Sequence, residues 1–496
     1  MFALSLPNIA QAESKPKPAA ADTASFEALF GHLMQQGNSG NFEGAISTLR
    51  QIIAHPRFTE LPVEMRAGIF NMLADAMVET NDYAGAYDNL KQAGALSDSV
   101  KDADYWILLA QLGNAVHQET ESVDALLKVA TDFPDAFKTL EDSTISQVLV
   151  LAETLDDSQK HKRLLEALHA ANYTPESPFK SAESYRQDLF EIYVRDGDTD
   201  KAAALAKTFE APSSLLRLIV DNRYAPYRGD AARMDLRAAE QRRLNRDRER
   251  MQAHPRLLEG VNNYVGTLED NDKAAEGLRI LDAALARTTT AGSPAFDDLS
   301  EELPRSHNLR ADLLKAQGRV DEAETAMVRA REETLKDGKL PVSQTLNLAV
   351  FYYKTAKPER ALEMVARLKS GRTSPYGLMV AESVRVCAYT QLGDTTRMQA
   401  ALDYLMARAE DGFGTLKQAL LCANKTDTLA ALIISRLDDP KTRTATLIGL
   451  QSYPVPAFET PFERTLRLRE EALIARPDIK AAVARYGIII SVPNAP

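Results

Sequence analysis

Apolar residues recur along most of the chain at the spacing of an α-helix, and short polar breaks divide them into pairs. Residues 346–368 show the pattern clearly: a first apolar stripe, the break "TAKP", and a second stripe that stops before Gly371. Pro358 can open the second helix because proline at the first helical position removes no helical hydrogen bond. The pattern predicts a helical hairpin with apolar positions at Leu346, Ala349, Val350, Tyr353, Ala361, Leu362, Val365 and Leu368.

The same spacing of small and large residues returns elsewhere in the chain. A small residue in the first helix is followed by an apolar residue three later, a small residue twelve later, and apolar residues four and seven beyond that. Small side chains let the helices of a hairpin approach closely, and larger ones fill the groove between hairpins. Complete copies begin at Ala74, Ala311 and Ala349; weaker or degenerate copies lie around Ala45, Ala125, Ala202, Gly277 and Met398 and within 145–171 and 419–437.

This signature resembles that of the tetratricopeptide repeat, which has a small residue and a tyrosine in the first helix and an alanine in the second. The family's turn glycine is matched by Gly40, Gly197, Gly318 and Gly393. The resemblance implies an all-α fold, a right-handed α-solenoid of about ten helix-turn-helix repeats. It also implies a non-catalytic scaffold that binds a protein or peptide in its concave groove, because the matched residues are structural in the family.

The pattern divides the chain into five segments, with repeats expected over 26–210 and 256–448. Residues 211–255 interrupt the repeats with prolines and a glycine, which indicates either a distorted hairpin or a joint between two lobes. Within them, the Arg-rich stretch 236–253 predicts a solvated helix with ion pairs, and a patch for an acidic partner is the alternative. Residues 449–496 are expected to cap the last repeat, with strand addition to a partner as the alternative.

The first 25 residues are expected to be a signal-like segment and a flexible spacer. A short apolar stretch from Phe2 to Leu6 precedes Ala10-Gln11-Ala12, the small-x-small pattern of a signal-peptidase site. We therefore expect export to a bacterial periplasm and a mature chain that begins near Glu13; the alternative is an unstructured terminus of a cytoplasmic protein. No run of 18 or more apolar residues occurs, so no membrane-spanning helix is expected.

The net charge limits the class of partner, and the cysteine content limits the possible disulfide bonds. A formal charge of -11 at pH 7 argues against a nucleic-acid partner, because binding a phosphate backbone relies on clustered Lys and Arg. Cys387 and Cys422 are the only two cysteines, and we expect them to be small buried hydrophobic residues. A bridge between them requires that they lie on adjacent first helices of neighbouring repeats.

No catalytic, cofactor or metal motif is present in the sequence. The seven histidines are scattered, no H-E-x-x-H occurs, and the glycine patterns of phosphate-binding loops and nucleophile elbows are missing. "YGLMVAESV", residues 376–384, shares Gly-Leu-Met and Glu-Ser with lytic transglycosylases, but the order is reversed and a glutamine is missing. We expect no enzyme and no cofactor; the alternatives are a scaffold subunit of a polysaccharide or surface-polymer secretion machine, and a cell-wall enzyme.

Partner-binding residues are expected on the first helices, which line the concave surface in the tetratricopeptide family. The family's carboxylate clamp is basic or neutral at these positions, whereas this chain has Asp75 and Asp312 there. Since like charges disfavour binding, a basic or hydrogen-bonding segment is expected rather than a free carboxylate. The alternative is a solvated polar surface without function. The expected groove residues are Asn71, Asp75, Asn308, Asp312, Lys315 and Tyr353.

Overall fold

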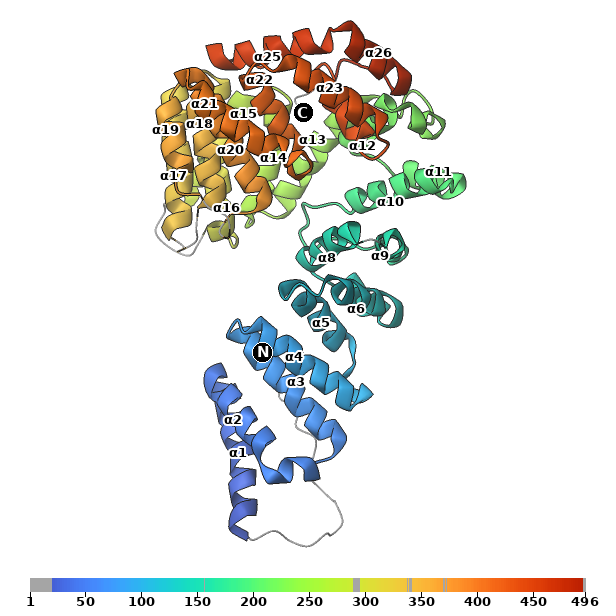
Figure 1. Cartoon of the computed structure of the whole chain (residues 1–496), viewed down its shortest axis with the longest axis vertical. Helices are drawn as coiled ribbons and strands as arrows, with labels where there is room; N and C mark the ends of the chain where they lie inside the picture. Colours follow the sequence, from blue (N-terminus) through green and yellow to red (C-terminus); the bar gives the residue numbers. More distant parts are fainter. Residues whose placement is uncertain are drawn as a thin grey trace. The chain divides into compact units, whose positions relative to one another are not determined.

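A computed structural model describes residues 20–493 apart from 156, 289–294, 337, 339–340, 369–370 and 372 (Figure 1). The described residues form helices and connecting segments, and the isolated β-bridges among them include Asp221 with Gly487 and Ser452 with Ser491. Successive helices pack as antiparallel pairs, and neighbouring pairs stack. The predicted all-α solenoid of helical hairpins is confirmed. The signal-like residues 1–19 lie outside the described residues, and a helix already begins at Ala20.

The first of two compact units contains the described residues up to Ile192. Its last helix, α10 (Glu183–Asp196), runs across the boundary. Short 3₁₀ turns at Pro56–Glu60 and Asp98–Val100 connect successive hairpins. The other helices are α1 (Ala20–Ser39), α2 (Phe42–Ala54), α3 (Val63–Glu79), α4 (Tyr83–Leu96), α5 (Ala103–Ala115), α6 (Glu119–Asp132), α7 (Pro134–Lys138), α8 (Asp142–Thr154) and α9 (Ser158–Ala170).

The second unit begins at Tyr193. Its helices are α11 (Thr199–Ala206), α12 (Pro212–Val220), α13 (Leu236–Ala253), α14 (Leu258–Asp270), α15 (Ala274–Thr288), α16 (Leu299–Ala316), α17 (Val320–Lys336), α18 (Val342–Lys354), α19 (Pro358–Val365), α20 (Pro375–Leu392), α21 (Thr395–Met406), α22 (Phe413–Cys422), α23 (Thr426–Asp438), α24 (Arg443–Ile448), α25 (Pro461–Ile474) and α26 (Pro477–Tyr486), with 3₁₀ turns at Asn222–Tyr227 and Ala409–Asp411.

The small residues of the repeat signature lie where the two helices of a hairpin touch. In the three complete copies all six are fully buried: Ala74, Ala86, Ala311, Ala323, Ala349 and Ala361. A weaker copy shows why the position stays small, since a Cβ added at Gly113 would lie 3.1 Å from the Cβ of Ser122 on the facing helix. Hairpin packing therefore depends on close backbone approach at these positions.

The hairpin turns place one residue in the left-handed region of the backbone. The four turn glycines have φ values of 67°, 81°, 76° and 72° at Gly40, Gly197, Gly318 and Gly393. Other turns put a different residue in the same conformation, including Asn81 at 62° and Ala356 at 59°. Glycine adopts this region without steric penalty, whereas alanine does so at some energetic cost. The turn geometry is thus repeated even where the glycine is replaced.

Residues 211–255 belong to the second unit, as α12, a 3₁₀ turn and α13. The Arg-rich helix α13 buries Leu236, Ala239 and Leu244 on one side. Arg243 lies on the same side, in the contact with α14, at 2.8 Å from Asp270 and 3.6 Å from Glu240. The helix carries ion pairs as expected, but these lie in a contact between helices rather than on a solvated face.

The C-terminal segment returns to the start of the second unit. Ile488 N–H donates to the carbonyl of Val220 at 3.0 Å, and the backbone there is so close that a Cβ on Gly487 would lie 2.1 Å from that carbonyl. Next to this contact the fully buried Asp221 accepts from Thr444 Oγ1 at 2.7 Å and pairs with Arg223 at 2.7 Å. The helix α24 and the residues after α26 therefore contact α12, near the start of the unit.

None of the described helices combines the length and the apolar character needed to cross a lipid bilayer.

Replacing Ala361 by Arg should destabilise the second unit by about 3 kcal/mol or more, because a long charged side chain would enter the contact between α18 and α19. Glu363→Arg on the same helix is the matched control, since Glu363 is exposed. Thermal unfolding followed by circular dichroism measures both variants. Equal melting temperatures for Ala361→Arg and the parent would contradict the assigned hairpin contact.

Candidate protein-binding grooves

The acidic site of unit 1 consists of Asn71, Asp75 and Glu79 on α3 with Asp102 and Asp104 at the start of α5. Asn71 and Asp75 are one helical turn apart and partly buried. Asn71 Oδ1 is buried without a hydrogen-bond partner, and the Asp75 side chain has no hydrogen bond or ion pair in the described part of the chain. Asp102 is fixed as the N-cap of α5, where it accepts from Tyr105 N–H at 3.0 Å.

Burial and neighbouring carboxylates act together on Asp75. Loss of solvation is the largest effect, and the negative charges of Asp104, Asp102 and Glu79 add to it, so that the pKa of Asp75 rises from 3.8 to about 6. Both causes disfavour the ionised form. The protein thus holds a carboxylate that its own fold does not neutralise, beside an amide oxygen that its own fold does not use.

The acidic site of unit 2 repeats this arrangement with Asn308 and Asp312 on α16 and Glu269 on α14. Asn308 Oδ1 is again buried without a partner. Asp312 is exposed, yet the protein atoms around it raise its pKa to about 6 against the opposing charges of Lys315 and Lys354. Burial, and then the charges of Asp312 and Asp270, raise the pKa of Glu269 to about 8. Neither Asp312 nor Glu269 has an ion-pair partner among the described residues.

Lys315 and Tyr353, two of the expected groove residues, contact α25, the second-last helix of the same unit. Lys315 Nζ lies 2.6 Å from Glu463 of α25, and Lys354 Nζ lies 3.9 Å from the same carboxylate. The ring of Tyr353, which is 2% exposed, packs edge-on against Phe462 with 6.1 Å between ring centroids. We call Lys315, Tyr353 and Lys354 the lysine site; it adjoins the acidic site of unit 2 on α16.

The first turn of α25 is built to hold Glu463 in this position. Thr460 and Glu463 form a reciprocal capping box, with Glu463 N–H donating to Thr460 Oγ1 at 3.2 Å. Thr460 Oγ1 also donates to the carbonyl of Lys354 at 2.7 Å. The cap therefore fixes the start of the helix and joins it to α18. Glu463, bound by both lysines, has its pKa lowered despite burial.

Sequence reasoning missed Glu269, Lys354 and the residues of α25. The Thr-x-x-Glu pattern at 460–463 is a recognisable helix start. It does not reveal where the helix docks, because no local spacing encodes a contact between residues more than one hundred positions apart. The acidic sites could be predicted in part, since Asn71 and Asp75 share the spacing of Asn308 and Asp312.

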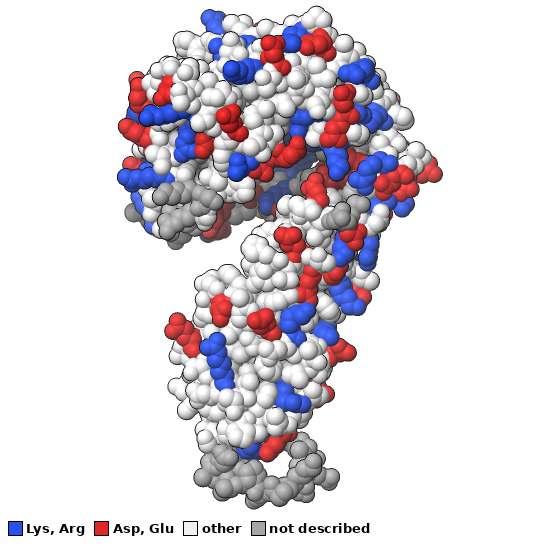
Figure 2. Space-filling model, in the orientation of Figure 1, with Lys and Arg blue, Asp and Glu red and all other residues white. Residues whose placement is uncertain are grey.

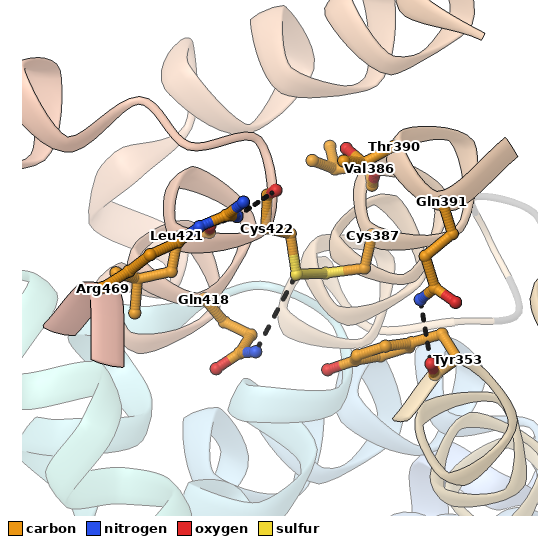
Figure 3. The surroundings of a disulfide bond; sticks show 9 residues. All are labelled: Tyr353, Val386, Cys387, Thr390, Gln391, Gln418, Leu421, Cys422 and Arg469. Atoms are coloured by element: carbon orange, nitrogen blue, oxygen red, sulfur yellow. Dashed lines mark hydrogen bonds between the residues drawn. A yellow bond between two sulfur atoms is a disulfide. The ribbon is translucent and has the colours of Figure 1, made fainter. Parts of the chain in front are cut away.

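Cys387 and Cys422 form a disulfide, which corrects the expectation of two buried thiols (Figure 3). They lie on α20 and α22, the first helices of neighbouring hairpins, with Cα atoms 5.1 Å apart. Both are fully buried. The bond links these hairpins next to α25, because Arg469 donates to the carbonyls of Leu421 and Cys422 at 2.7 and 2.9 Å.

The described residues do not form a metal centre. No group of three or more His, Cys, Asp or Glu side chains among them could hold a metal ion. Glu382 of the "YGLMVAESV" stretch pairs with Arg385 on the same helix, and Ser383 is buried. Over the face shown in Figure 2, Lys and Arg are interspersed with Asp and Glu. The uncompensated carboxylates of the acidic sites differ from this paired surface.

Comparison with known proteins gives no family assignment. No protein-family model matches the chain, and no curated protein matches it. Among solved structures, the chain is similar to one titled "Crystal structure of APC/C hetero-tetramer Cut9-Hcn1", with 12% sequence identity over 93% of this chain and 96% of that one, and a TM-score of 0.29.

Asp75→Asn should stabilise unit 1 at pH 7.5 by about 1–3 kcal/mol, because the folded state there carries a charge that burial disfavours. Well below pH 3.8 the carboxyl is protonated in both states, so the gain should vanish. It should appear as the pH rises from 3.8 through about 6. Urea unfolding followed by the fluorescence of Trp106, the only tryptophan, reports on this unit.

Asp88→Asn is the matched control, because Asp88 is exposed on α4. A stability gain for Asp75→Asn that equals that of Asp88→Asn, or that is independent of pH, would contradict the assigned environment of Asp75.

Replacing both cysteines by Ala should lower the free energy of unfolding by about 3–4 kcal/mol, because the disulfide restricts the unfolded chain over a sequence separation of 35 residues. Non-reducing alkylation and intact-mass analysis of the parent checks the bond itself. Two alkylated cysteines in protein isolated without reductant would show that it does not form.

Proposed function

We propose that this protein is a non-catalytic scaffold of the tetratricopeptide type, which binds basic or hydrogen-bonding segments of other proteins at its two acidic sites. One observation carries the proposal. In each unit an Asn–Asp pair at positions i and i+4 combines a buried amide oxygen that lacks a partner with a carboxyl whose pKa is raised to about 6.

A cationic side chain from a partner would satisfy both groups of a pair. A nearby positive charge favours the ionised carboxylate and would lower the pKa of Asp75, while an N–H donor would pair with Asn71 Oδ1. The buried amide oxygen carries a desolvation penalty as long as it has no donor. Both groups therefore destabilise the free protein, and binding removes the penalty. Groups that destabilise a fold in this way are typical of binding sites.

The two sites favour the same class of ligand for the same reason. Glu79, Asp102 and Asp104 surround the Asn–Asp pair of unit 1, and Glu269 stands beside the pair of unit 2. Carboxylates attract Lys and Arg and repel a free C-terminal carboxylate. The ligand is thus a peptide segment with at least one Lys or Arg and further hydrogen-bond donors.

We also propose that the protein acts in an exported, periplasmic compartment. The Cys387–Cys422 disulfide supports this location, because disulfides persist in oxidising compartments and are rare where thiols are kept reduced. The signal-like pattern at Ala10-Gln11-Ala12 points to the same location.

An array of peptides with single Lys or Arg residues in a neutral background tests the ligand class. Asn71→Ala with Asp75→Ala should weaken capture at unit 1 by about tenfold or more, and Asn308→Ala with Asp312→Ala should do so at unit 2, on the scale of one charged hydrogen-bonded pair. Binding by the parent should fall as the pH drops through about 6, because a protonated carboxyl no longer attracts a cation.

The control variant is again Asp88→Asn, which removes one negative charge from an exposed surface. Crosslinking and mass spectrometry on extracts of the native host then identify the natural partner. Equal capture by the parent and by both double variants, each shown to be folded, would place the binding surface elsewhere.

A further inference from the structure

We propose that the lysine site of unit 2 is a second binding surface, specific for an aromatic residue followed by a carboxylate at the start of a helix, and that Phe462 and Glu463 of α25 occupy it as an intramolecular ligand. A partner segment of the same chemistry would compete with α25 for Lys315, Tyr353 and Lys354. This inference concerns a site of opposite charge to the acidic sites and does not rest on their function.

The contacts of α25 have the composition of a peptide ligand in a groove. The carboxylate of Glu463 lies between two lysines, at 2.6 Å from Lys315 and 3.9 Å from Lys354. The Phe462 ring meets that of Tyr353, and Thr460 donates to the carbonyl of Lys354. Aromatic anchors and charged pairs with little solvent contact are typical of the residues that carry binding energy at interfaces. The side chains of Lys315 and Glu463 are 21% and 15% exposed.

The contacts that attach α25 to the repeats are mainly polar. Leu466 and Leu473 are its only buried residues within the described chain, whereas Leu468 is 52% exposed. Apart from the Phe462 ring, its other contacts with the hairpins include charged side chains, such as Glu470 with Lys417 at 2.5 Å and Arg469 with the carbonyls at the end of α22. Helices of the repeats are instead fixed by rows of buried apolar residues, as in α20 and α22.

The segment before α25 is tied to that helix by Glu459, which accepts from Arg467 at 2.6 and 3.0 Å, whereas the end of the chain is held by other elements. The preceding segment 453–459 has no regular secondary structure and exposes Val455. After it, α26 buries Ile479, Ala482 and Val483, and Ile488 is bonded to Val220. Release of α25 therefore leaves the end of the chain attached. Segments with few buried apolar contacts open at lower free energy than the core.

Without Glu463 the lysine site would hold two neighbouring cations. Lys354 lies in a crowded environment where burial lowers its pKa, Glu463 opposes that effect, and Lys315 adds to it. Asp312 of the acidic site is the other nearby anion. Removal of Glu463 thus leaves positive charge without its carboxylate partner. The carboxylate of an acidic partner segment could bind at the same position.

The test uses the full chain and a fluorescent peptide that copies Ala457–Ala475. The parent should bind the peptide weakly, because its own α25 fills the site. A chain with Phe462→Ala and Glu463→Gln should bind it at least tenfold more tightly, measured by fluorescence anisotropy. Adding Lys315→Ala and Lys354→Ala to that chain should abolish the gain. Glu471→Gln is the matched control, since Glu471 pairs with Arg467 of the same helix.

Two results would overturn the proposal: a folded Phe462→Ala, Glu463→Gln chain that binds the peptide no better than the parent, or a gain that persists without the two lysines. If that chain does not fold, hydrogen exchange of the parent tests whether α25 detaches from the lysine site. Amides of α25 should exchange faster than those of α20 and α22, and Thr460→Ala should accelerate them further. Equal protection of α25 and α20 in the parent would show that α25 is a permanent part of the core. The peptide also carries Arg464, Arg467 and Arg469, which fit the ligand class of the acidic sites. Binding there is common to the parent and the variants, so only the difference between them tests the lysine site.

Discussion

The fold depends on the close approach of two helix backbones within each hairpin. That approach requires a residue no larger than alanine on each helix, and all six such residues in the complete copies of the signature are fully buried. The spacing of twelve between them sets the length of the turn, because both must face the same contact. Larger side chains one turn further on are then left to pack between hairpins. Stacking, and the surfaces that stacking produces, follow from this contact.

The hairpins follow from one local spacing of small residues, so the sequence predicts them well. Contacts between residues far apart in the chain do not follow from that spacing, and the sequence predicts them poorly. Ala349 and Ala361 could be assigned to facing helices from spacing alone. The docking of Glu463 on Lys315 could not, because it joins residues far apart in the chain and each has an unremarkable local environment. Cys387 and Cys422 lie between these cases: the repeat register placed them on neighbouring first helices, but only three-dimensional geometry could show that the two side chains meet.

The charges of the protein divide into two kinds. On exposed helix faces ionic side chains often have partners, as Lys128 does on α6. At Asp75 burial and neighbouring carboxylates raise the pKa, and at Asp312 and Glu269 burial raises it against the opposing charge of Lys315. The lysine site shows the opposite case, in which the chain supplies the counter-ion from its own helix α25. At the acidic sites the counter-ion would come from a partner.

The contact of Gly487 and Ile488 with Val220 changes how the second unit should respond to disruption. In an open solenoid each repeat contacts only its neighbours, so stability is a sum of local terms and the ends fray first. Here the terminal elements of the unit bond to each other, through Ile488 with Val220 and Thr444 with Asp221. Repeats joined in this way do not unfold from a free end. Destabilising one hairpin of the second unit should therefore affect the hairpins on both sides of it.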